Sequence, residues 1–75
     1  MSQRGRNSLV GIRQHEAVNA FVRLGGTERP GKGSHRVVNL NGMNLSIPHG
    51  VLKEGLLRHL IKISGFTSED FLKEL

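Results

Sequence analysis

The stretch GKGSHR, at positions 31 to 36, places a histidine between glycines and cations. A neutral His35 imidazole can take a proton from a ribose 2′-hydroxyl, and a protonated one can give a proton to a leaving 5′-oxygen. Glycines let a phosphodiester backbone come close, and Lys32, Arg36 or Arg29 would stabilise charge on phosphorus. The residue types favour anion chemistry, while the spacing alone also suits an ordinary strand histidine.

Two other chemistries fit these residues poorly. The segment from Gly26 resembles the phosphate-loop pattern G-x-x-x-x-G-K-[ST], but Gly33 stands where the magnesium-binding hydroxyl is needed, and 75 residues cannot supply a nucleotide-binding sheet. The histidines form no pair at metal-ligand spacing and have no cysteine to help them, so we expect no metal and no cofactor. They are His15, His35, His49 and His59.

Composition indicates one small basic domain. The chain has 75 residues, a net charge of +5 and a pI near 10.9, which favours polyanionic partners such as nucleic acid. The absence of cysteine suits a reducing cytosol. No apolar run is long enough to cross a membrane, and the start MSQRGRNSL lacks the apolar core of a signal peptide. We therefore expect a cytoplasmic protein.

The sequence divides into a flexible N-terminal arm, residues 1–12, and a single domain, residues 13–75. From about Gln14, apolar residues recur at helical spacing until Gly25 and Gly26 end the helix. A short edge strand is predicted over 27–29, because Pro30 and its neighbouring glycines prevent a longer one.

A β-hairpin gives the clearest local signal, because HRVVNL and MNLSIP flank the two-residue turn Asn41-Gly42. This turn sets the register and places His35 on the polar face of the sheet, close to His49, while the other face packs on helices. A helix from about residue 53 to Gly65 and a short last helix follow. The order predicts an α+β fold, α-β-β-β-α, with a three-stranded antiparallel sheet and helices on one face.

Several segments, in their order along the chain, resemble the HicA toxins of bacterial and archaeal HicAB toxin–antitoxin modules. GSH opens the hairpin, IPHG closes it, and LKEGLLRHLIKISGFTSEDFLKEL follows. The similarity runs from about Gln14 to Leu75. The chain departs from the family in the residues before the first helix, in the strand-poor TERPG, and in Val37 and Val38, where many members have an aromatic residue.

The resemblance implies a fold like that of double-stranded-RNA-binding domains (dsRBD-like). It also implies an mRNA interferase, an endoribonuclease that cleaves mRNA without a metal and is neutralised by a HicB antitoxin. The family's catalytic histidine falls on His35. Our own assignments from residue chemistry add further RNA contacts: Arg29, Lys32, Gly33, Ser34, Arg36 and His49. Two alternatives stay open: a non-catalytic RNA-binding module, and an interaction subunit whose free sheet face binds a protein.

Overall fold

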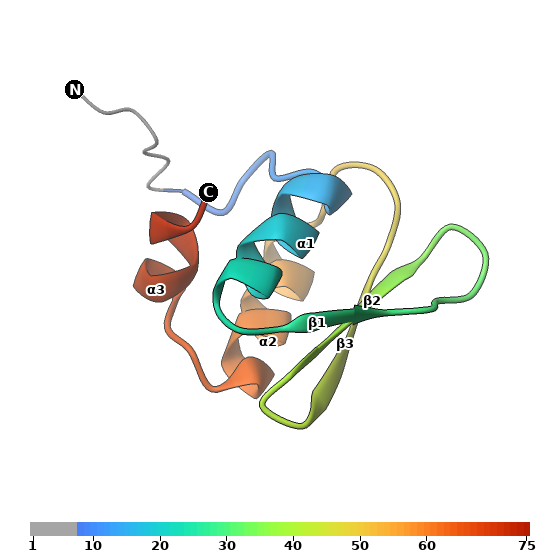
Figure 1. Cartoon of the computed structure of the whole chain (residues 1–75). Coiled ribbons are helices and arrows are strands. Elements are labelled where there is room, and N and C mark those ends of the chain that lie inside the picture. Colours follow the sequence, from blue (N-terminus) through green and yellow to red (C-terminus); the bar gives the residue numbers. More distant parts are fainter. Residues whose placement is uncertain (1–7) are drawn as a thin grey trace.

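The computed structural model describes residues 8–75, which form a three-stranded sheet packed against helices (Figure 1). The elements in chain order are α1 (Gln14–Arg23), β1 (Thr27–Arg29), β2 (Arg36–Leu40), β3 (Met43–Ile47), α2 (Glu54–Ser64) and α3 (Ser68–Lys73). The strands are antiparallel in the order β1-β2-β3. The predicted α+β class and element order are confirmed. None of the helices in this part of the chain is long and apolar enough to span a bilayer.

The β2–β3 hairpin has the predicted register, with Leu40 opposite Met43 and Val38 opposite Leu45. Asn41 and Gly42 have φ values of 54° and 81°, the left-handed conformations that a type I′ turn requires. Because side chains alternate along a strand, Val38 and Leu45 share one face and are fully buried beneath the helices. The turn therefore determines which face of the sheet faces the core.

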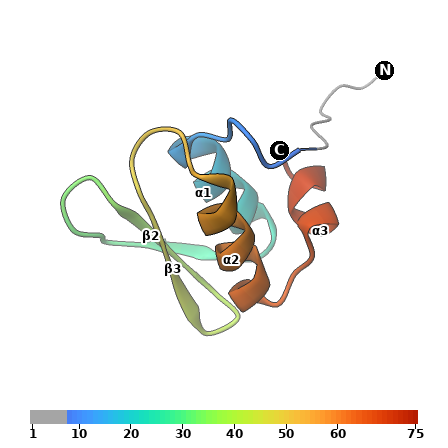
Figure 2. The same ribbon diagram turned by 180° about the vertical axis from the view of Figure 1, so that it is seen from behind.

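Helix α3 closes the core from the end opposite the β1–β2 connection (Figures 1 and 2). Thr67 caps it, since the Asp70 N–H donates to the Thr67 hydroxyl (3.1 Å) and the Thr67 N–H donates to the Asp70 carboxylate (3.0 Å). The Phe71 ring is fully buried, with its centroid 5.0 Å from that of Phe21 in α1. This aromatic contact joins the first and last helices.

The packed region begins earlier than the sequence predicted. Leu9 and Ile12, assigned to the flexible arm, are 4% and 0% exposed and belong to the core. The Leu52 N–H donates to the Ile12 carbonyl at 2.8 Å, and Arg13 pairs with Val51 in an isolated bridge. Residues 9–12 show no repeating apolar pattern that would have revealed their burial, and the core begins before the predicted boundary at residue 12. Residues 1–7 of the arm lie outside the described part.

Candidate functional site

The candidate site centres on the β1–β2 connection, residues 30–35, which projects from the sheet at the end away from α3 (Figure 1). All six residues are exposed. The connection turns sharply, since the His35 N–H donates to the Lys32 carbonyl at 3.1 Å and Gly33 has a φ of +59°. At Gly31 the backbone passes so close to His35 that a Cβ there would overlap the His35 carbonyl oxygen. The position of His35 therefore depends on a glycine at residue 31.

Gln14 connects this loop to two other segments. Its side-chain amide donates to the Ser34 carbonyl at 2.7 Å and to the Ile47 carbonyl, at the end of β3, at 2.9 Å. Its backbone N–H donates to the Gly50 carbonyl at 3.0 Å. Ser34 and Gly50 are the chain neighbours of His35 and His49. The structure thus brings these two predicted site segments to the same place, the start of α1.

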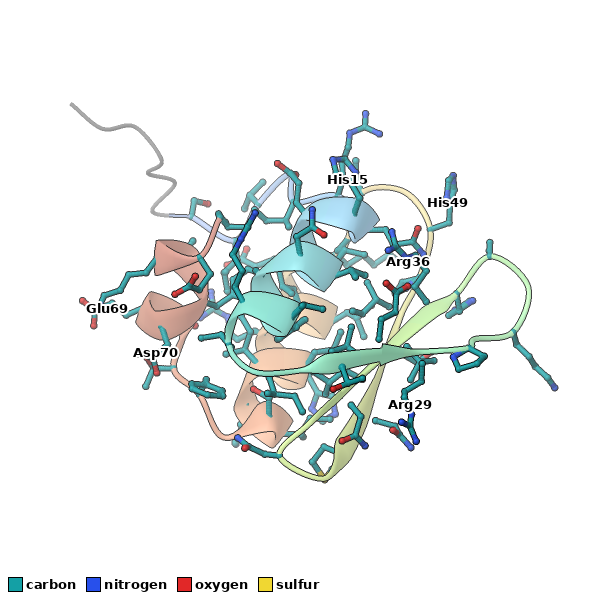
Figure 3. All side chains as sticks on the ribbon, viewed as in Figure 1. His15, Arg29, Arg36, His49, Glu69 and Asp70 are labelled. Atoms are coloured by element: carbon teal, nitrogen blue, oxygen red, sulfur yellow. The ribbon has the colours of Figure 1, made fainter. Side chains whose placement is uncertain are left out.

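The third histidine at this end is His15, for which the sequence predicted no metal-binding role. Figure 3 shows His15 at the start of α1 and His49 on the connection that passes it. Both side chains are exposed, as is His35. Within residues 8–75, no group of three or more histidine or carboxylate side chains is placed to hold a metal ion. His35 and His49 are chain neighbours of residues that Gln14 contacts, and His15 follows Gln14 in the chain.

Arg36 is engaged by a carboxylate. Its Nε and one terminal nitrogen donate to the two oxygens of Glu28, at 2.8 and 2.9 Å. These hydrogen bonds hold the pKa of Glu28 below its ordinary value, a small loss of hydration opposes them, and the charge of Arg36 adds to the lowering. The side chains are 38% and 41% exposed, so water and a competing anion can reach the pair. Arg36 is therefore not the free cation that its predicted role assumed.

Arg29 lies on the opposite face of the sheet from Arg36. Arg29 pairs with Val37 across the β1–β2 ladder, whereas Arg36 shares its face with Val38. Figure 3 shows the two guanidinium groups on opposite sides of the ribbon. In the described part of the chain, neither Arg29 nor the loop residue Lys32 forms an ion pair, and both are exposed. These two cations, close to His35 in the chain, are available to an anionic ligand.

The carboxylates near His15 and His49 in the sequence already form hydrogen bonds or ion pairs within the protein. Glu16 accepts a hydrogen bond from the Arg13 backbone N–H at 2.9 Å, and Glu54 pairs with Arg58 one turn along α2. Arg13 pairs with Val51 in an isolated bridge, Lys53 follows Val51 by two residues, and both cations are exposed. The end of the molecule that carries the three histidines is thus rich in accessible positive charge, which attracts phosphate backbones.

Sequence reasoning missed Gln14 and Glu28. Glu28 had a usable signal, because the hairpin register and the short edge strand together place it diagonally across from Arg36 on one face. Gln14 had none, since its partners Ser34 and Ile47 are far along the chain and accept through backbone carbonyls. Any residue type presents such a carbonyl, so no pattern of side chains reports it.

From the lowered pKa of Glu28 we predict how the stability of the fold changes as the pH falls. A carboxylate whose pKa is lower in the folded state stabilises the fold above its unfolded-state pKa, and the contribution is lost as the pH falls through the folded-state value. We expect wild-type stability to fall more steeply than that of Glu28→Gln between about pH 6 and pH 3. Urea unfolding across this range measures the difference. Glu69→Gln is the control, since it removes an acid outside the Glu28–Arg36 pair. Parallel stability-against-pH curves for wild type and Glu28→Gln would contradict a stabilising role of this pair.

Comparison with protein-family models finds no match, and no curated protein matches the chain.

Proposed function

We propose that this protein is the toxin of a HicAB-type toxin–antitoxin module, an endoribonuclease that cleaves mRNA with His35. In this proposal the fold is dsRBD-like, the protein acts in the cytoplasm, and a HicB-type antitoxin covers the site. Support comes from the ordered motifs that resemble HicA and from the α-β-β-β-α order of the elements. The observation that carries the proposal is an exposed histidine in a sharply turned glycine-rich loop, with the exposed cations Arg29 and Lys32 close to it in the chain.

The chemistry that fits these groups is transesterification within the RNA strand. The ribose 2′-oxygen attacks phosphorus, its proton passes to a base, the bond to the 5′-oxygen breaks, and that oxygen receives a proton. The products are a 2′,3′-cyclic phosphate and a 5′-hydroxyl. His35 serves as the proton-transfer group, and Lys32 and Arg29 are the free cations that stabilise the charge on the phosphoryl oxygens. Gly33, Ser34 and His49 line the approach.

The test is incubation of the purified protein with a mixed RNA substrate in EDTA, followed by analysis of the product ends. We expect cleavage with 2′,3′-cyclic phosphate and 5′-hydroxyl ends. Intact RNA after long incubation, with the protein folded and bound to the RNA, would contradict the proposed nuclease activity.

Co-expression with a HicB-type protein should suppress the growth arrest that the toxin causes, and unrelieved arrest would count against the antitoxin part of the proposal.

One observation favours the non-catalytic RNA-binding module as a second candidate. Glu28 already occupies the guanidinium of Arg36, which leaves fewer cations beside His35 to stabilise a transition state. A module that only binds RNA needs accessible cations and no proton transfer. It predicts salt-sensitive RNA binding with no products.

Release of Arg36 should strengthen RNA binding. In Glu28→Gln the amide has no charge to hold the guanidinium, which then becomes available to a phosphate. We expect binding tighter by about three- to tenfold at low salt, with a steeper salt dependence. The matched control is Glu54→Gln, which makes the same change of charge and frees Arg58 on α2. Equal gains in the two variants would mean that net charge alone is responsible and that Arg36 does not contact the RNA.

A further inference from the structure

Gln14, in the first turn of α1, forms hydrogen bonds to segments that are distant in the sequence. Both hydrogens of an amide group are donors, and here each goes to a backbone carbonyl of a different segment, Ser34 before β2 and Ile47 at the end of β3. Its own N–H goes to Gly50, in the connection after β3. One residue of α1 therefore joins two parts of the chain that are remote from it in sequence, the loop before β2 and the segment from Ile47 to Gly50.

These contacts fall on the segments that carry the candidate chemistry. Ser34 immediately precedes His35, and Ile47 and Gly50 flank Pro48 and His49. The loop before His35 has little else to hold it, because its residues are exposed and its other described hydrogen bond is the internal turn from His35 to Lys32. Beyond the β1–β2 pairing at its base, the hydrogen bond from Gln14 to Ser34 ties this loop to the body of the protein.

We propose that Gln14 is a positioning residue of the site, whose amide holds the His35 loop and the His49 segment at a fixed separation. The inference rests on the proposed nuclease function. Proton transfer needs the imidazole within hydrogen-bonding reach of the reacting oxygen, and a displacement of about 1 Å costs on the order of 100-fold in rate. Both hydrogen-bond acceptors of the Gln14 side chain are backbone carbonyls, so Gln14 acts through the position of His35 and does not react.

The alternative is that Gln14 only stabilises the fold, and Asn41 provides the matched comparison. The Asn41 side-chain amide also donates to a backbone carbonyl of a distant segment, Ser64 at 2.7 Å, but it lies in the hairpin turn at the other end of β2. Gln14→Glu and Asn41→Asp each exchange an amide for a carboxylate of equal size and remove the donor. Gln14→Met removes the donors without adding charge.

The experiment measures single-turnover RNA cleavage at saturating protein, together with the dissociation constant for RNA and the thermal midpoint. We expect Gln14→Met and Gln14→Glu to lower the saturating rate by at least about tenfold, with RNA affinity unchanged in Gln14→Met. Asn41→Asp should keep the wild-type rate even where it lowers the thermal midpoint. A wild-type rate in Gln14→Met, or an equal loss in Asn41→Asp, would overturn the positioning role.

The positioning role of Gln14 can be tested even if the protein does not cleave RNA. If the wild-type protein binds RNA without cutting it, the proposed function falls, and amide hydrogen exchange then tests Gln14 directly. Faster exchange at residues 31–36 in Gln14→Met than in Asn41→Asp would support the role of Gln14 in holding the loop. Unchanged exchange there would reject it.

Discussion

Replacing His35 by glutamine is expected to lower RNA cleavage by about 10²–10⁴-fold. Glutamine keeps a polar side chain that can form hydrogen bonds, but it cannot take up or release a proton near neutral pH. Because the His35 side chain is exposed, the free energy of unfolding should change by less than about 0.5 kcal/mol. Single-turnover cleavage and urea unfolding of the same preparations measure both effects.

The matched control is His59→Gln, which changes another exposed histidine, on α2 rather than in the β1–β2 connection. It should cleave RNA at the wild-type rate. RNA binding by His35→Gln should stay within a few-fold of wild type, because the surrounding cations are unchanged. Undiminished cleavage by His35→Gln would eliminate His35 as the proton-transfer group, and an equal loss in both variants would point to a general effect of charge.

Gly31→Ala should lower cleavage by about 100-fold. A Cβ at this position would overlap the His35 carbonyl oxygen, which is backbone and cannot rotate away, so the loop must shift and carry His35 with it. The forced contact should also cost about 1–3 kcal/mol of stability, as overpacking does elsewhere. The rate at saturating RNA, the thermal midpoint and the amide spectrum of residues 31–36 report the two effects.

Gly55→Ala is the control for this substitution. Gly55 lies in the first turn of α2, where an added Cβ meets nothing within 4 Å and alanine is the better helix former. That variant should be as stable as wild type or slightly more so, with normal cleavage. Normal cleavage in Gly31→Ala would mean that the loop relaxes without moving the imidazole, and that the close backbone contact has no bearing on the site.

Local patterns predicted most of the fold. The turn Asn41-Gly42 has one favoured geometry, so it determined the hairpin register and, through alternation, the buried face of the sheet. The edge strand Thr27–Arg29 was predicted with its observed bounds because Pro30 removes a backbone donor at the next position. In both cases the cause lies within a few residues of the effect.

The remaining features depend on contacts between distant residues. Ile12 is buried where it pairs with Leu52, Leu9 belongs to the same core, and no apolar periodicity in the sequence indicates either. In the candidate site, His35 and its glycine-rich loop could be identified from residue types alone. The Glu28–Arg36 pair and the amide contacts of Gln14 required the register and the packing of α1, so residue chemistry by itself suggested more free cations than the site has.

The contact between Phe21 and Phe71 has a consequence for synthesis on the ribosome. Phe21 leaves the ribosome before its buried partner Phe71, which follows it by fifty residues. The carbonyls of Ile47 and Gly50 also have to emerge before Gln14 can bind them. Because non-local contacts form only when both segments are present, an incomplete chain lacks the assembled site. The candidate site would therefore be assembled only after the chain as far as Phe71 has left the ribosome.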